Sequence, residues 1–292
     1  MKKIFFNQKF EPKGNKIIHG AGQSPEQFKK YWNAVEDCKP VIYMDYIKVD
    51  EIKDKFENKI NRMLEFLKKL MPQIGLNLKS KTKGSLCKEV SVGEYDSQIN
   101  FFVEVLKKIK NPCFVRIGFE FDAKGKYNPK DFIDAWMHIV KLIRKNKAEN
   151  IATVWCACPY NGTEDVEQFY PGDEYVDWFG VDVFSAKYFN NYKPIEDFLK
   201  LAESHKKPVM VGESSPAKTG VDKGKESWDE WFEPYFEWIK SHPIIKAFCY
   251  IDWDWGKDWK QPEWLNGRIE ENEEVRRRYV EELKNPRYIH LE

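Results

Sequence analysis

Short apolar segments alternate with longer amphipathic segments along the whole of this chain. The short segments have the length of buried strands, and the longer ones repeat apolar residues every three or four positions, as helices do. The pattern predicts strands at 17–22, 39–47, 72–78, 112–122, 151–159, 176–185, 207–216 and 245–255.

Helical segments separate these strands. They are predicted at 25–35, 95–109, 128–146, 194–205, 227–242 and 272–283, with one more long helix that follows the second strand and ends at Leu70. Ser24 and Pro25 are typical N-cap and first-turn residues, and Asp96 or Ser97 is expected near the start of the helix 95–109. Only the fifth strand is followed by a weak segment, 164–170.

Eight strands in alternation with at least seven helices predict an α/β chain that forms a single (β/α)8 TIM barrel, one domain over residues 1–292. The main competitor is an open doubly wound sheet. It is disfavoured because the residues after the first strand, AGQSP, do not form the Gly-rich phosphate-binding turn of that fold.

Composition excludes several classes of function. Hydrophobic residues make up 42% of the 292 residues, charged residues 33%, and the net charge is +1, which disfavours nucleic acid as a partner. No apolar run approaches the ~20 residues of a membrane helix, and MKKIFF is too short for a signal peptide. We therefore expect no membrane partner, a monomer, and a location that stays open between the cytoplasm and export with a signal removed.

The six cysteines lie mostly in apolar segments, so they are expected to be small buried side chains. Cys156 and Cys158 form C-x-C without a second cysteine pair or nearby histidines. That spacing disfavours zinc, and we expect neither a metal nor a cofactor.

Two glutamates stand at strand ends, where (β/α)8 barrels carry their sites. Glu120 follows the apolar run of the fourth strand, and Glu213 that of the seventh. Because these strands lie nearly opposite each other in a barrel, the two carboxylates are expected to face across its mouth. Retaining glycosidases use such a pair, with carboxyl groups about 5–5.5 Å apart. Either glutamate alone would be interpreted as a solvated or ion-paired residue.

Alternation along the fourth strand would place Arg116, Gly118 and Glu120 on one face and turn Phe119 and Phe121 away. An arginine inside a barrel needs an anionic partner. We expect Arg116 to reach Glu213, or to pair with Asp182 of the sixth strand.

Four segments carry a resemblance to known enzymes: PCFVRIGFEFDAKGKYNP, DWFGVDVF, KPVMVGESSP and AFCYIDWDW. They resemble the glycoside hydrolases of clan A, family 26 in particular, over about residues 40–285. The resemblance implies endo-acting, retaining hydrolysis of a β-linked polysaccharide or oligosaccharide, with Glu120 as acid/base and Glu213 as nucleophile.

The chain departs from that family at two positions. Phe119 stands where the clan has Asn and family 26 has His, a residue that contacts the sugar. Phe184 stands where strand six often carries a Tyr, with Tyr188 a few residues on. These departures put β-mannanase activity in question.

Further residues are candidates for sugar binding. Trp253 and Trp255, on one face of the eighth strand, and Trp155 are expected as platforms for sugar rings, with core packing as the alternative. The polar candidates are Asp182 within strand six, Tyr43 and Asp45 at the end of strand two, and His19 at the end of strand one, for which a satisfied core histidine is the alternative.

Two other functions stay open. A barrel that binds carbohydrate without catalysis is supported by Phe119. A different barrel chemistry would need a strand-end lysine, for which Lys187 is the one mild candidate, or a histidine cluster. The five histidines are scattered instead: His19, His138, His205, His242 and His290.

Overall fold

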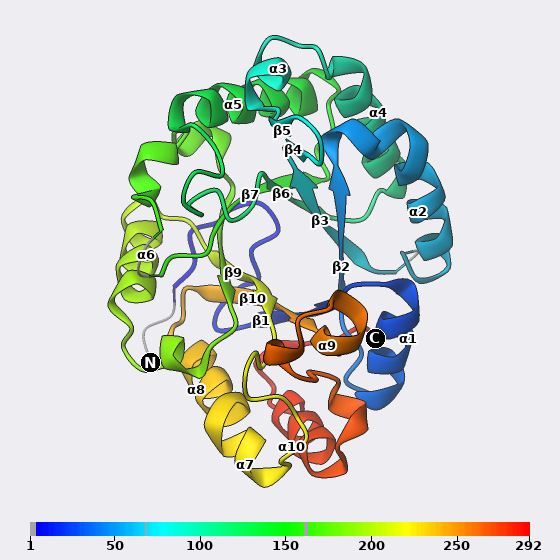
Figure 1. The fold of residues 1–292 in the computed structure, drawn as a ribbon, viewed down its shortest axis with the longest axis vertical. Helices are drawn as coiled ribbons and strands as arrows, with labels where there is room; N and C mark the ends of the chain where they lie inside the picture. The colour runs from blue at the N-terminus through cyan, green and yellow to red at the C-terminus, as the bar shows by residue number, and fades with distance from the viewer. Residues whose placement is uncertain (1–3, 68, 161–162) are drawn as a thin grey trace. The chain divides into compact units, whose positions relative to one another are not determined.

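The computed structural model describes residues 4–67, 69–160 and 163–292, and it has the predicted alternation of strands and helices (Figure 1). The chain is a (β/α)8 barrel, as predicted. The barrel strands are β1 (Ile17–Gly22), β2 (Ile42–Lys48), β3 (Met71–Asn77), β6 (Cys113–Ile117), β7 (Ile151–Ala157), β8 (Trp178–Val183), β9 (Val209–Ser214) and β10 (Ile245–Ile251). The sheet order is β10-β9-β8-β7-β6-β3-β2-β1-β11, and β10 also pairs with β1.

Helices follow the strands, with a few short elements in the loops. The helices are α1 (Pro25–Ala34), α2 (Ile52–Leu67), α3 (Cys87–Ser91), α4 (Asp96–Ile109), α5 (Pro129–Lys145), α6 (Lys193–Ser204), α7 (Lys225–Ser227), α8 (Glu233–Ser241), α9 (Trp255–Trp259) and α10 (Glu273–Leu283). The short strands are β4 (Lys79–Ser80), β5 (Gly84–Ser85) and β11 (Tyr288–Ile289). Single helical turns are η1 (Val49–Glu51), η2 (Val166–Phe169), η3 (Asp173–Tyr175), η4 (Ala186–Phe189), η5 (Trp228–Phe232, a π-helical turn), η6 (Pro262–Trp264) and η7 (Ile269–Glu271).

Local sequence explains where the helices begin. Ser24 Oγ accepts a hydrogen bond from the N–H of Gln27 at 3.3 Å, which confirms it as the N-cap of α1. Asn128 caps α5 in the same way, with Pro129 in the first turn. Asp96 lies at the start of α4, as predicted, whereas the N-cap is Tyr95, which makes no side-chain capping bond. Asp96 is the first helical residue, and its carboxylate contacts His138 Nε2 at 2.6 Å.

The chain divides into two compact units. The first unit comprises Met1–Asn7, Glu11–Tyr43 and Val181–Glu292, and the second comprises Gln8–Phe10 and Met44–Gly180. Whether 1–292 is one domain stays a prediction. No helix among the described residues is both long and apolar enough to span a membrane.

Parallel pairing holds the strands within each unit. In the first unit β1 pairs with β10 from Ile18↔Ala247 to Gly22↔Ile251, and β10 pairs with β9. In the second unit β6 lies between β3 and β7, and α5 packs against α3 and α4 (Figure 1). Most strand residues are buried on both faces, as expected where helices cover a parallel sheet.

Candidate active site

Glu120 lies in a turn directly after β6, not in the strand. The strand ends at Ile117, and both Gly118 (φ 56°) and Glu120 (φ 51°) have left-handed backbone conformations. A non-glycine residue rarely adopts this conformation, and such strain is often found at functional sites. The N–H of Glu120 donates to the carbonyl of Cys156 at 2.8 Å, which fixes the turn against β7. The Glu120 side chain is 31% exposed.

This turn corrects the predicted alternation of side chains. The fourth strand was predicted to reach residue 122, and its extended backbone ends five residues earlier. Phe119 does not turn away: its ring centroid lies 4.8 Å from the Arg116 guanidinium carbon. Phe121 points to the opposite side, where its ring stacks on Trp155 with centroids 4.5 Å apart.

Lys126 lies next to Glu120 and was missed by the sequence analysis. Its ammonium nitrogen is 3.9 Å from Glu120 Oε2 and donates a hydrogen bond to the carbonyl of Phe119 at 2.6 Å. It also lies 4.9 Å from the centroid of the Phe119 ring, in a cation–π contact. No spacing rule would have singled out this loop lysine. The Lys126 ammonium is thus held beside both Phe119 and Glu120.

Asp122 also stabilises the turn that carries Glu120, and it was not predicted from the sequence. Its carboxyl is fully buried, and Oδ1 accepts a hydrogen bond from the N–H of Cys158 at 2.9 Å. Burial raises the pKa of Asp122 to about 6. The carboxyl ties the turn that carries Glu120 to the end of β7.

Glu213 lies inside β9, as the sequence analysis predicted for the seventh strand. It is 7% exposed, so little of it reaches solvent. The residues that follow it are fixed by buried hydroxyl groups. Ser214 Oγ lies 2.8 Å from Tyr235 Oη and donates to the carbonyl of Cys249 at 3.0 Å, and Ser215 Oγ donates to the carbonyl of Ile251 at 3.1 Å. The backbone at Glu213 is therefore held rigidly.

Arg116 and Asp182 are both fully buried in barrel strands, β6 and β8. Within the second unit the guanidinium of Arg116 contacts sulfur atoms, with Nη1 3.6 Å from Cys156 Sγ and Nη2 3.9 Å from Met44 Sδ. It also lies 5.5 Å from the centroid of the Tyr46 ring. That Arg116 reaches Glu213 or Asp182 stays a prediction.

Trp253 and Trp255 lie after β10 rather than in it, which corrects the predicted end of the eighth strand at 255. The strand ends at Ile251, and Trp255 opens α9. The two rings still meet edge to face, with centroids 5.8 Å apart. Trp255 is buried and its Nε1 donates to Ser215 Oγ at 2.9 Å, whereas Trp253 is half-buried. Trp253 therefore has more surface available to a ligand.

Trp155 and Tyr43 have the contacts of core residues. Trp155 is fully buried among Phe121, Tyr170 and Phe179, and its Nε1 donates to the carbonyl of Phe169 at 3.2 Å. Tyr43 is the second residue of β2, not its last. Its hydroxyl donates to the carbonyl of Gln23, and its ring meets Phe28 edge to face at 4.6 Å. These contacts favour the core-packing interpretation for both.

Asp45 lies in the middle of β2, which continues to Lys48. Its carboxylate is buried and lies 2.6 Å from Lys59 Nζ of α2, and it accepts a hydrogen bond from the N–H of Tyr46 at 2.7 Å. The ion pair between β2 and α2 accounts for this buried charge.

His19 is the third residue of β1, not its last, and is fully buried. Its Nε2 lies 2.6 Å from Tyr31 Oη, and its Nδ1 lies 3.1 Å from Nδ1 of His290. Because His290 Nε2 faces the carbonyl of Leu283 at 2.8 Å and must donate to it, His290 Nδ1 is the acceptor for His19. This is the satisfied core histidine of the alternative interpretation.

The histidine pair predicts a stability that falls in acid. Burial lowers the pKa of His19 well below its usual 6.5, with a further contribution from His290, and burial also lowers the pKa of His290. Below pH ~6.5 the folded protein then binds fewer protons than the unfolded chain. The contribution of this pair to the free energy of unfolding is therefore complete above that pH and decreases as the pH falls below it. Each unit of lowering corresponds to about 1.4 kcal/mol.

Urea unfolding at pH 7.5, 6.0 and 5.0 measures this effect. The control is His290→Gln, which keeps a donor for Leu283 and removes one titrating group, so its dependence on pH is expected to be shallower. Equal slopes for wild type and variant would contradict the assignment.

The remaining groups that could carry chemistry are the cysteines and the side chains that bind metals. All six cysteines are buried and unpaired in disulfides, as predicted. Within residues 4–67, 69–160 and 163–292, no three or more His, Cys, Asp or Glu side chains are grouped in a way that could hold a metal ion.

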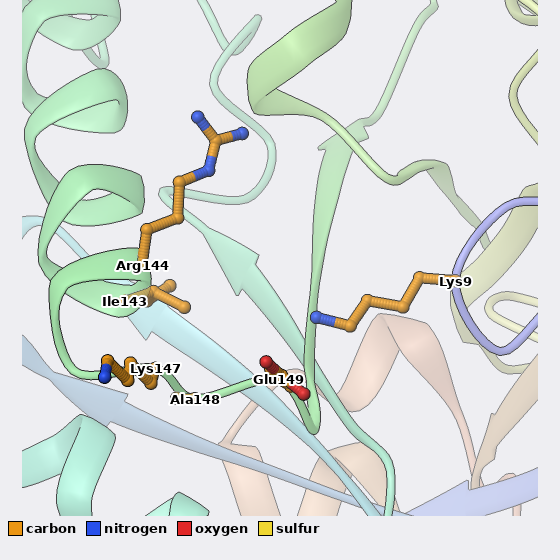
Figure 2. Close-up of a pocket in the computed structure, with 6 residues that line it drawn as sticks. All are labelled: Lys9, Ile143, Arg144, Lys147, Ala148 and Glu149. Carbon is orange, nitrogen blue, oxygen red and sulfur yellow. The ribbon is translucent and has the colours of Figure 1, made fainter.

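A pocket of about 260 Å³ lies at the opposite end of the strands. Figure 2 shows the residues that line it, which come from the end of α5, the turn that follows and the N-terminal segment: Lys9, Ile143, Arg144, Lys147, Ala148 and Glu149. The turn leads into the N-terminal end of β7, whereas barrel sites occupy the C-terminal ends of strands. One of the cations that line the pocket, Lys9, already has a partner, because its Nζ donates a hydrogen bond to the carbonyl of Ile151 at 2.6 Å. We assign no role in catalysis to this pocket.

Comparison with solved structures shows the same fold in carbohydrate-active enzymes. The chain superposes on a GH26 beta-mannanase from Bacteroides ovatus with a TM-score of 0.68 at 14% identity, covering 95% of this chain and 91% of the other. An endo-beta-1,4-mannanase double mutant from Cellulomonas fimi gives a TM-score of 0.69 at 14% identity, over 94% of this chain and 72% of the other. This likeness shows that the chain shares the (β/α)8 barrel fold of these structures.

Sequence comparison finds a likeness to one family of glycoside hydrolases. The model of glycosyl hydrolase family 26 matches residues 117–240, a segment that contains both Glu120 and Glu213. A beta-1,3-xylanase, TXYA, from a Vibrio species is 28% identical over 228 residues, and one from an Alcaligenes species is 23% identical over 305 residues. These matches cover 68% and 94% of this chain but 49% and 64% of the relatives, so the chain spans about half to two thirds of their length. The chain is a family 26-like barrel.

Proposed function

We propose that this protein is a retaining glycoside hydrolase that cleaves internal glycosidic bonds of a β-linked polysaccharide. The observation that carries the proposal is the position of two glutamates: Glu120 directly after the fourth barrel strand and Glu213 in the seventh. The likeness to family 26 over residues 117–240 supports the same pair. Glu120 is the proposed acid/base and Glu213 the proposed nucleophile.

The proposed reaction has two displacements at the anomeric carbon. First, a carboxylate oxygen of Glu213 attacks that carbon, the bond to the leaving oxygen breaks, and Glu120 gives its proton to that oxygen. Second, the Glu120 carboxylate takes a proton from water, the water oxygen attacks the anomeric carbon, and Glu213 is released. Two inversions at the anomeric carbon give net retention of its configuration, and Glu120 ends the cycle protonated again.

Other residues have supporting roles in this proposal. Arg116, buried in β6, is the proposed cationic partner of Glu213. Asp182 binds a sugar hydroxyl or pairs with Arg116. Half-buried Trp253 is the platform beneath a sugar ring, because the C–H faces of a pyranose pack well on indole.

β-1,3-Xylan is the first substrate to test, because both curated relatives are named beta-1,3-xylanases. β-1,4-Mannan is the second, because of the mannanase structures with the same fold. Release of reducing ends from each polymer measures the activity. Activity on either is expected, and binding without any release would favour the carbohydrate-binding barrel, the alternative that Phe119 supports.

Lys126 gives this proposal a test through pH. Its ammonium, 3.9 Å from Glu120, favours the charged carboxylate, whereas the acid must be protonated. In Lys126→Met the alkaline limb of the pH profile of kcat/KM is therefore expected to move to higher pH. The control is Lys130→Met, an exposed lysine of α5 paired with Asp134. An unmoved limb with equal loss of rate at all pH values would give Lys126 a purely structural role.

A further inference from the structure

Trp259 is an exposed tryptophan at the end of α9, with 57% of its surface open to solvent. Exposed apolar side chains that adjoin one another are a common mark of a ligand-binding surface. Trp259 was not among the tryptophans predicted from the sequence to bind sugar.

The rings of Trp259 and Trp253 contact each other. Their ring centroids lie 5.5 Å apart and their planes are tilted by 36°. We call this pair the tryptophan shelf. Two further rings support it, because Trp255 contacts Trp253 edge to face and lies 4.8 Å from Trp264.

The loop that carries the shelf is held in place by its own hydrogen bonds. The Asp254 carboxylate accepts from the N–H of Lys257 at 3.1 Å, and the N–H of Gly267 donates to the carbonyl of Trp253 at 2.7 Å. Arg268 Nη2 lies 2.6 Å from Asp258 Oδ2. A surface fixed in this way loses little conformational entropy when it binds a ligand.

The shelf is anchored beside Glu213. Trp255, which supports it, donates from Nε1 to Ser215 Oγ at 2.9 Å, and Ser215 follows Glu213 by two residues. The same Oγ donates to the carbonyl of Ile251, the last residue of β10. The shelf therefore lies near the C-terminal ends of β9, which contains Glu213, and β10 (Figure 1).

We propose that the tryptophan shelf binds two successive sugar units of a β-linked glycan, one on Trp253 and the next on Trp259. The inference rests on the proposed function for the class of ligand. Sugar rings offer C–H faces to indole, and the shelf continues the surface of the proposed platform.

The test is native electrophoresis through gels that contain β-1,3-xylan or β-1,4-mannan, compared with a gel without polymer. Wild-type protein is expected to be retarded by β-1,3-xylan, and Trp259→Ala to raise the dissociation constant about tenfold. Trp259→Phe should restore part of the retardation. The control is Lys257→Ala, an exposed residue of the same helix, which should behave as wild type. Thermal unfolding of all variants should be unchanged, because Trp259 is exposed.

Several results would overturn the inference. These are a wild type that no polymer retards, a Trp259→Ala variant that is retarded as strongly as wild type, or a wild-type dimer that Trp259→Ala converts to a monomer without loss of retardation. Failure of the proposed function is distinguishable. Retardation that depends on Trp259 without release of reducing ends would contradict hydrolysis and leave the shelf as a binding surface.

Discussion

Turnover of the polysaccharide substrate is expected to fall about 10⁴-fold or more in Glu213→Ala. The variant lacks the oxygen that attacks the anomeric carbon, so no glycosyl-enzyme forms. Glu213 lies in a buried, hydrogen-bonded stretch of β9, so the loss is compared with circular dichroism and thermal unfolding of the same sample. Initial rates of reducing-end release on β-1,3-xylan measure the effect.

The control for Glu213→Ala is Glu226→Ala, a glutamate on α7 that pairs with Lys223 at 2.7 Å on the surface. It should keep wild-type rates. A folded Glu213→Ala protein with wild-type turnover would remove Glu213 from the mechanism.

Loss of Glu120 is expected to depend on the leaving group. Glu120→Ala should lower turnover of the polysaccharide about 10³-fold, because its leaving alcohol needs a proton. An aryl glycoside with an activated leaving group needs none for the first step, so the glycosyl-enzyme should still form and accumulate. Added azide should then restore turnover, because it attacks the anomeric carbon without a general base.

Glu104→Ala on the exposed face of α4 is the matched control for Glu120→Ala, and azide should not change its rate. A Glu120→Ala variant that loses activity equally on both substrates, without rescue by azide, would contradict the acid/base role.

The fold could be predicted because strand and helix periods differ so clearly. Helix α5 shows this well: Asn128 and Pro129 mark its start, and apolar residues repeat through Ile143. The ends of strands were less predictable. Apolar residues continue past Ile117 and Ile251, where the backbone has already turned, and only the conformation at Gly118 reveals the first turn.

The direction in which strand residues point was the weakest part of the prediction. Both faces of these strands are buried, so alternation separates two faces without telling which one faces the barrel interior. His19 and Tyr43 were candidates for sugar binding because they were expected at strand ends, and Trp155 as a tryptophan of the fifth strand. Each has the contacts of a core residue. Lys126 lies in a loop and Trp259 ends the five-residue helix α9, which is too short for a periodic pattern.

One measurement tests the central proposal most directly. A 2-fluoro-substituted aryl β-xyloside with an activated leaving group is the reagent. Its fluorine slows both displacements, and its leaving group offsets this for the first displacement only, so a covalent intermediate accumulates on the nucleophile. After proteolysis, mass spectrometry should find one fluoroxylosyl group on the peptide that contains Glu213, and none in Glu213→Gln. Label on a different carboxylate, or none while the wild type hydrolyses xylan with inversion, would contradict the account.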